Sequence, residues 1–313
     1  MSAVAYLFPG QGAQAVGMGK SFYDRYAVSR DVYQQANRAL GFDVTALCFE
    51  GPQERLTRTE ICQPALFVTS IAAYAAFREQ APALKPVGAA GLSLGELTSL
   101  AVAEACSLRD GLYIVKARAE AMAECAARHQ GAMLAVIGLA DEAIQSVCQG
   151  SGAAVANDNA QDQVVLSGTV DAMTKAEELA KAQGAKRVLK LDVAGAFHSA
   201  LMQPAADALK QVLAKIELRP PRFPVISNVT AQPAEDPEQI RELLVRQIVS
   251  PVRWEPSMRY LIQAGMTHAV EFPPARVLTG LLRRIDHAVK GIAVDAPEDF
   301  AKLSDMPASL RRS

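Results

Sequence analysis

The chain has 313 residues, of which 50% are hydrophobic and 21% are charged, as in a globular protein with a full hydrophobic core. This composition excludes a disordered chain, a collagen-like repeat and a coiled coil. The 32 basic and 33 acidic residues give a net charge of −1, and no long run of like charge points to nucleic acid or a membrane surface as a partner. At roughly 150 residues per domain, the length predicts two folding units or one large domain with an insertion.

The cysteines and the first residues predict a cytoplasmic protein. The five cysteines are odd in number, widely spaced and never in a C-x-x-C pair, which indicates buried thiols in a reducing compartment rather than a metal or redox site. They are Cys48, Cys62, Cys106, Cys125 and Cys148. The first ten residues lack the positive charge of a secretory signal, and no uninterrupted apolar run of membrane-spanning length occurs.

Strand-length apolar stretches alternate with longer helical patterns, which predicts an α/β fold with parallel strands. Residues 3–8 are expected to form the first buried strand, and residues 87–91 a central strand. We expect helices over 30–40, 64–77 and 108–126, and a helix that begins near Glu96.

Residues 133–191 follow a different pattern, because strands and helices alternate there in the order βαββαβ, which is ferredoxin-like. The expected strands are 133–138, 153–156, 163–167 and 186–191, the helices 141–148 and 170–183, and the turns 149–152 and 157–162. This segment is predicted to be an inserted subdomain. The predicted domains are therefore a large α/β domain over 1–128 and 196–313 and a small subdomain over 129–195.

The sharpest chemical signal is Gly91-Leu92-Ser93-Leu94-Gly95, a G-x-S-x-G pattern between a predicted strand and a predicted helix. Small neighbours allow a nucleophile elbow, in which a strained turn exposes the serine hydroxyl at a helix N-terminus. The alternative is a glycine-rich turn with an incidental serine.

A serine nucleophile needs a base, and His198 is the candidate because it follows a strand and precedes a helix, whereas His129, His268 and His287 have no suggestive neighbours. A lone loop histidine is more often a surface residue, and spacing alone does not pair His198 with Ser93.

Three further places carry weaker signals. The loop Phe8-Pro9-Gly10-Gln11-Gly12-Ala13-Gln14 could direct backbone N–H groups at an anion or oxyanion, but it lacks the G-K-[ST] and G-x-G-x-x-G patterns of nucleotide sites. Arg118 lies among small apolar residues, although helix arginines usually extend their charged end into solvent. Gln247 reads as an ordinary helix-end residue.

Taken in order along almost the whole chain, these segments resemble the malonyl-CoA:acyl-carrier-protein transacylase family. The resemblance is carried by Gly10-Gln11-Gly12-Ala13-Gln14, Gly91-Leu92-Ser93-Leu94-Gly95-Glu96, Arg118, Val164-Val165-Leu166-Ser167-Gly168, Ala196-Phe197-His198-Ser199, Gln247 with Pro251-Val252-Arg253-Trp254, and Val277-Leu278-Thr279-Gly280-Leu281. It implies an α/β-hydrolase-like large domain with a parallel sheet and an inserted ferredoxin-like subdomain.

The resemblance also implies a role for each matching residue. Ser93 would be the acylated nucleophile and His198 its general base and later acid, oriented by Gln247 as a neutral third group. Arg118 would bind the malonyl carboxylate. The backbone N–H groups of Gln11 and Leu94 would form the oxyanion hole.

The activity so implied moves malonyl from malonyl-CoA through a seryl ester to the phosphopantetheine thiol of acyl carrier protein, in fatty-acid or polyketide synthesis. No metal or other cofactor is implied, and we expect a monomer. One alternative is a hydrolase that releases acyl groups from the carrier, which a carboxylate-binding Arg118 disfavours. The other is a non-catalytic binding subunit of a synthase complex, which an intact Ser93 and His198 disfavour.

Two departures from the family pattern are visible. Leu92 stands where the family usually has histidine before the nucleophile, and Phe272-Pro273-Pro274-Ala275 replaces its usual Gly-Pro-Gly. The first is expected to alter serine reactivity without removing the base, and the second to alter the local loop.

Overall fold

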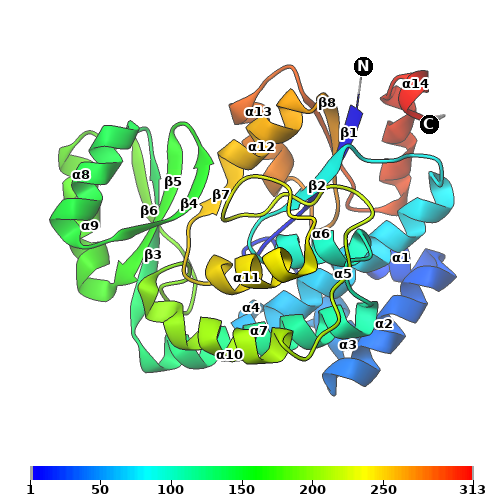
Figure 1. Ribbon diagram of the computed structural model, residues 1–313, viewed down its shortest axis with the longest axis horizontal. Helices are drawn as coiled ribbons and strands as arrows, with labels where there is room; N and C mark the ends of the chain where they lie inside the picture. Colours follow the sequence, from blue (N-terminus) through cyan, green and yellow to red (C-terminus); the bar gives the residue numbers. More distant parts are fainter. Residues whose placement is uncertain (1–2, 312–313) are drawn as a thin grey trace.

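The computed structural model describes residues 3–311, which form two sheets side by side with helices packed around them (Figure 1). The large sheet has the strand order β2-β1-β8-β9, and all its neighbouring strands are parallel, as the α/β pattern predicts. Its strands are β1 (Ala3–Phe8), β2 (Gly88–Gly91), β8 (Met266–Glu271) and β9 (Lys290–Ala293).

The helices around the large sheet include those predicted at 30–40, 64–77, 96 onward and 108–126, which are present with longer bounds as α2, α5, α6 and α7. The shorter helices α1, α3 and α4 were not predicted. The helices are α1 (Lys20–Arg25), α2 (Ala27–Leu40), α3 (Val44–Glu50), α4 (Gln53–Thr57), α5 (Thr59–Gln80), α6 (Leu94–Val102), α7 (Leu108–Arg128), α10 (Gln203–Leu213), α11 (Pro237–Gln247), α12 (Trp254–Gln263), α13 (Val277–Ile285) and α14 (Ala308–Arg311), with 3₁₀ segments at Ala200–Met202 and Pro297–Asp305.

Strand β1 is apolar throughout because both faces of the large sheet are covered. Val4, Tyr6 and Phe8 pack on one face against α5, and Ala5 and Leu7 pack on the other face against α12 and α13. By length and composition α5 could cross a membrane, although polar residues interrupt its apolar run, yet 72% of its most apolar window is buried inside the protein. Here α5 is the central core helix.

The small sheet has the order β6-β3-β5-β4-β7. Its first four strands are antiparallel and, with two helices on one face, form the predicted ferredoxin-like unit. The fifth strand, β7, comes from the C-terminal part of the chain and pairs parallel with β4, an addition that the sequence did not predict. The elements are β3 (Gly131–Ile137), α8 (Asp141–Ser151), β4 (Ala154–Ala160), β5 (Gln163–Thr169), α9 (Val170–Ala182), β6 (Arg187–Lys190) and β7 (Val252–Arg253).

Three local predictions in this part of the chain are wrong. The turn expected over 157–162 is shorter, because β4 continues to Ala160 and its pairing with both β5 and β7 outweighs the turn preference of its Asn and Asp residues. The turn expected over 149–152 is instead the end of α8, which runs to Ser151 and is capped by Gly152 at φ 79°. Cys148 on α8 is half-buried, whereas the other four cysteines are buried.

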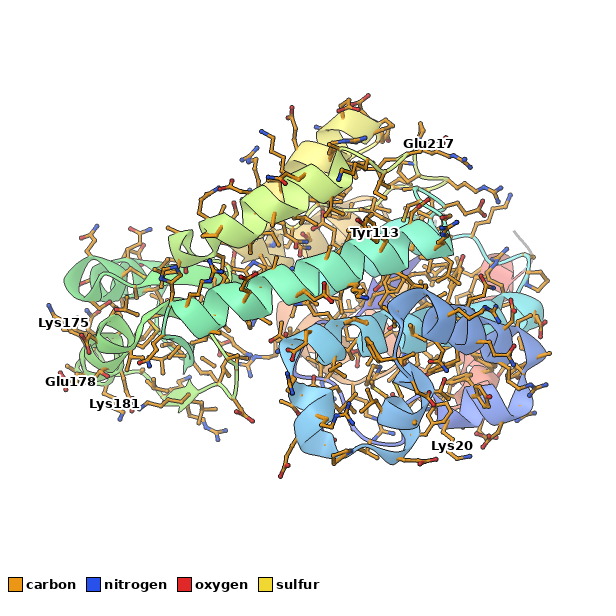
Figure 2. All side chains as sticks on the ribbon, turned by 90° about the horizontal axis from the view of Figure 1, so that it is seen from below. Lys20, Tyr113, Lys175, Glu178, Lys181 and Glu217 are labelled. Atoms are coloured by element: carbon orange, nitrogen blue, oxygen red, sulfur yellow. The ribbon has the colours of Figure 1, made fainter. Side chains whose placement is uncertain are left out.

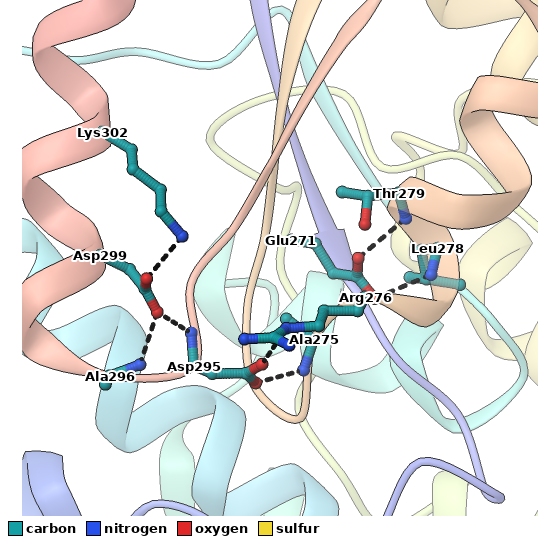
Figure 3. Close-up of polar contacts among 9 residues, drawn as sticks. All are labelled: Glu271, Ala275, Arg276, Leu278, Thr279, Asp295, Ala296, Asp299 and Lys302. Atoms are coloured by element: carbon teal, nitrogen blue, oxygen red, sulfur yellow. Dashed lines mark hydrogen bonds and ion pairs between the residues drawn. The ribbon is translucent and has the colours of Figure 1, made fainter.

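The loop after β8, where the sequence departs from Gly-Pro-Gly, is held at both ends by carboxylates (Figure 3). Glu271, fully buried, accepts the N–H groups of Leu278 and Thr279 at 2.8 Å each and so caps the start of α13. Asp295 accepts the N–H of Ala275 at 2.6 Å. The replacement loop is therefore tied to both β8 and the segment after β9.

Helix α7 links the two sheets along the underside of the molecule (Figure 2). Tyr113 on its outer face is 50% exposed, and α10 packs alongside it. At the left of the same view lies α9, with the labelled side chains Lys175, Glu178 and Lys181. Arg118, five positions after Tyr113, faces inward and is 1% exposed, so α7 carries this cation into the interior between the sheets.

Candidate active site

Ser93 lies in the turn between β2 and α6 with φ 53° and ψ −99°, a conformation that residues with a side chain rarely adopt. Both glycines of the pattern are required by close backbone contacts. A Cβ on Gly91 would lie 1.9 Å from the carbonyl carbon of Gly95, and a Cβ on Gly95 would lie 2.1 Å from the carbonyl oxygen of Phe8. The G-x-S-x-G pattern thus forms the strained strand-turn-helix geometry that it predicts.

The structure brings His198 next to Ser93, although 105 residues separate them in the sequence. The Nε2 atom of His198 lies 2.8 Å from Ser93 Oγ, and its Nδ1 atom lies 2.9 Å from the main-chain oxygen of Gln247. A carbonyl oxygen only accepts, so Nδ1 carries the proton and Nε2 is free to accept the serine proton. His198 is 4% exposed, so the expectation of a surface histidine is wrong.

Burial sets the protonation state of this imidazole. Desolvation, assisted by the charge of Arg118, lowers the pKa of His198 to about 4, although hydrogen bonding of the ring to the backbone opposes the shift. The ring is therefore neutral at physiological pH, which is the state that can accept a proton.

Arg118 is buried beside the serine and does not extend into solvent. Its Nη2 donates to Ser93 Oγ and to Gln247 Oε1 at 2.9 Å each, and its Nη1 donates to Gln63 Oε1 at 2.6 Å. Within residues 3–311 its Nε has no partner. Burial lowers the pKa of Arg118 to about 10, with Glu96 acting in the opposite direction, so the guanidinium stays charged near neutral pH.

Within residues 3–311, all of the acceptors that contact Arg118 are neutral. Burying a guanidinium that contacts no carboxylate costs free energy of desolvation, unless a bound anion compensates its charge. Because guanidinium binds carboxylate through paired N–H donors, this position beside Ser93 suits a substrate that carries a free carboxylate.

Gln247 contributes through both its main chain and its side chain. It ends α11, so its carbonyl oxygen is not used within the helix and can accept from His198. Its side-chain oxygen accepts from Arg118 as described, and its Nε2 donates to the main-chain oxygen of Ser93 at 3.0 Å and to Glu96 Oε2 at 2.6 Å. One residue thus contacts the serine, the histidine and the arginine.

Three residues of this network were not assigned from the sequence, namely Gln63, which accepts from Arg118, and Asn228 and Glu96. Asn228, fully buried, accepts the N–H of Ser93 at 2.8 Å and donates to the oxygen of Gly91 at 2.8 Å. It lies in an irregular loop with no motif around it. Glu96 directly follows the G-x-S-x-G pattern, which was its only signal, and burial raises its pKa to about 7.

Gln11 and Leu94 adjoin the serine from two different elements, and both line the cavity in front of it. Leu94 is the first residue of α6, whose first N–H groups have no partner within the helix. Gln11 follows Gly10, where a Cβ would lie 2.4 Å from the main-chain oxygen of Leu92. Only glycine lets the loop after β1 approach the Ser93 turn this closely.

A cavity of about 220 Å³ separates the Ser93 turn from the small sheet. The strands β3, β4 and β5 supply the side chains opposite Ser93, namely Met133, Ala135, Asn157, Asn159, Gln163 and Val165. The Oδ1 atom of Asn159 is buried and has no partner in the described part of the chain. Across residues 3–311, no group of three or more His, Cys, Asp or Glu side chains could hold a metal ion.

Comparison with known proteins places these observations in a family. Residues 5–296 match the acyl transferase domain family. Malonyl CoA-acyl carrier protein transacylase of Bacillus subtilis (strain 168) is 42% identical over 303 residues, which cover 95% of each chain.

Comparison with solved structures supports the same family. An acyl carrier protein S-malonyltransferase from Vibrio cholerae superposes with a TM-score of 0.92 at 38% identity, over 96% of this chain and 100% of that one. A malonyl-transacylase solved in complex with a type II polyketide synthase acyl-carrier protein gives 0.93 at 37% identity, over 97% and 100%. The chain therefore belongs to the acyl transferase family.

Proposed function

We propose that the protein moves a malonyl group from malonyl-CoA, through an ester on Ser93, to the phosphopantetheine thiol of acyl carrier protein, in fatty-acid or polyketide synthesis. The observation that carries this proposal is the buried Arg118 guanidinium, which contacts Ser93 Oγ and, in the described part of the chain, has only neutral acceptors. The names of the similar proteins support the same substrate and carrier.

In the first half-reaction, His198 Nε2 accepts the proton of Ser93 Oγ while Oγ attacks the thioester carbonyl carbon of malonyl-CoA. The main-chain N–H groups of Gln11 and Leu94 donate to the oxyanion that forms. The bond from carbon to sulfur then breaks, and His198 returns the proton to the sulfur of coenzyme A.

The second half-reaction reverses these steps with another thiol. His198 accepts the proton of the phosphopantetheine thiol, its sulfur attacks the Ser93 ester, and the proton returns to Oγ as the ester bond breaks. Atoms and electrons balance without a metal or redox group, so we propose that malonyl-CoA and holo-acyl carrier protein are the only reactants.

Arg118 would hold the free carboxylate of malonyl in both half-reactions. Moving a carboxylate out of water into a buried pocket requires a fixed cation, and paired N–H donors also fix its orientation. We expect this to keep the ester carbonyl in one position between the N–H groups of Gln11 and Leu94.

The five free cysteines, four of them buried, support a reducing compartment, and we propose the cytoplasm as the site of the reaction. We also expect the protein to act as a monomer.

The proposal is tested by incubating the protein with labelled malonyl-CoA and holo-acyl carrier protein and measuring malonyl-carrier and free malonate. We expect malonyl-carrier to exceed free malonate, and no transfer to apo-carrier, which lacks the thiol. Free malonate as the main product would support the hydrolase alternative instead. No product of either kind, with Ser93 unmodified, would support a binding subunit.

A further inference from the structure

We propose that Glu96 is a positioning residue for malonyl selection, because one of its carboxylate oxygens fixes the Gln247 side-chain amide in the orientation that holds Arg118 beside Ser93. This inference rests on the proposed malonyl transfer and adds to it a residue that does not contact the substrate.

Glu96 points from the first turn of α6 into the protein and is 3% exposed. Its Oε2 atom accepts two hydrogen bonds, from Gln247 Nε2 at 2.6 Å and from the main-chain N–H of Asn228 at 3.0 Å. Both donors are neutral, and both residues also contact Ser93: Gln247 Nε2 donates to the main-chain oxygen of Ser93, and the Asn228 side-chain oxygen accepts the N–H of Ser93. A single oxygen therefore joins the two residues that surround the strained turn.

The orientation of the Gln247 amide follows from that oxygen. An amide offers donors on one side and an acceptor on the other. With Nε2 directed at Glu96, Oε1 faces Arg118 Nη2 at 2.9 Å. The flipped amide would place donor against donor at Arg118 and acceptor against acceptor at Glu96, so the carboxylate oxygen selects the productive orientation.

The negative charge of Glu96 has a different consequence from its oxygen. In its ionised form Glu96 attracts Arg118 and supports the guanidinium charge. An incoming malonyl carboxylate would compete with that same anion for Arg118, since like charges repel. Removing the charge while keeping the oxygen should therefore leave malonyl selection intact.

Two variants separate oxygen from charge. Glu96→Gln can keep an acceptor oxygen where Oε2 lies, with its NH₂ group in the place of Oε1, and it removes the charge. Glu96→Asp keeps the charge but withdraws the oxygen by one methylene. For each variant, kcat/KM is measured with malonyl-CoA and with acetyl-CoA, using holo-acyl carrier protein as acceptor.

We expect Glu96→Gln to keep the ratio of kcat/KM for malonyl-CoA to kcat/KM for acetyl-CoA within about threefold of that of the native protein. Glu96→Asp should lower this ratio by about tenfold or more, as the loss of one hydrogen bond implies. A preserved ratio in Glu96→Asp would overturn the inference. So would a loss of the ratio in Glu96→Gln, and this second result can overturn the inference even if the aspartate variant does not fold.

Glu271→Asp is the matched control, because Glu271 is a buried carboxylate that caps α13 outside the cavity (Figure 3). It should lower the Tm without changing the ratio. A general loss of stability would lower kcat/KM equally for malonyl-CoA and acetyl-CoA in all variants. That result would assign Glu96 a structural role only. If the native protein itself showed no preference for malonyl, the proposed function would fail and the inference with it.

Discussion

Arg118 and His198 contact the same atom: Ser93 Oγ accepts from Arg118 Nη2 at 2.9 Å and lies 2.8 Å from His198 Nε2. The hydroxyl can satisfy both contacts, because it donates its one proton to the imidazole and accepts from the guanidinium. The cation stabilises negative charge that develops on Oγ and also lowers the pKa of His198. In the proposed function, substrate selection and serine activation therefore share one buried charge.

Replacing Arg118 by alanine should convert a preference for malonyl into tolerance of uncharged acyl groups. Loss of one partner of a buried charge pair costs roughly 2–5 kcal/mol, or about 30-fold to several-thousand-fold in kcat/KM for malonyl-CoA. Acetyl-CoA has no carboxylate to lose, so its kcat/KM should fall little or rise. Arg118→Lys should restore malonyl transfer only in part, because lysine lacks the paired donors. Equal losses on both substrates would mean that Arg118 is structural.

Replacing His198 by alanine should slow both half-reactions, since one base serves both. The expected loss is about 10²–10⁴-fold, the range of a positioned acid or base. Rapid-quench measurement of serine loading and of transfer to the carrier checks each step separately. An unchanged transfer rate would mean that another group acts as base.

The pH dependence of malonyl loading should reflect the buried imidazole. His198 must be neutral to accept a proton, and its pKa is lowered to about 4, so kcat/KM should hold as pH falls through 6.5 and decline only near about 4. Glu96, with a pKa of about 7, also gains a proton in this range, but its acceptor oxygen remains. A decline centred near 6.5 would contradict this assignment.

Replacing Leu92 by histidine should change the loading rate by less than about tenfold, because this residue lines the cavity but has no part in the proton transfers. Steady-state rates with malonyl-CoA provide the check. A switch from no activity to full activity in Leu92→His would mean that the native chain is not a working transferase.

The sequence predicted those parts of the structure that local patterns encode. Periodicity indicated the parallel sheet and the ferredoxin-like unit, and the glycines around Ser93 indicated a strained turn. The strand β7 has only two residues, too few for any pattern. Asn157 and Asp158 pair with both β7 and β5, which keeps them in β4 instead of the predicted turn.

Local sequence patterns could not predict the hydrogen-bond network around Ser93, for a related reason. Asn228 and Gln247 reach the serine turn from 135 and 154 residues away in the sequence. Their partners are set by how α11 and the loop at 227–230 pack against α6. Arg118 gave only a weak local signal, from the small apolar residues around it, and the family resemblance alone assigned roles to Arg118 and Gln247. The resemblance did not indicate Asn228 or the burial of Glu96.

The most direct test of the account is the intact mass of the protein after brief mixing with malonyl-CoA in the absence of carrier. The native chain should gain the mass of one malonyl group, located at Ser93 by peptide mapping, and should lose it when holo-acyl carrier protein is added. Ser93→Ala should fold, because the hydroxyl contributes little to packing, and should gain no mass. Malonylation of Ser93→Ala, or no adduct on the native chain, would contradict the central claim.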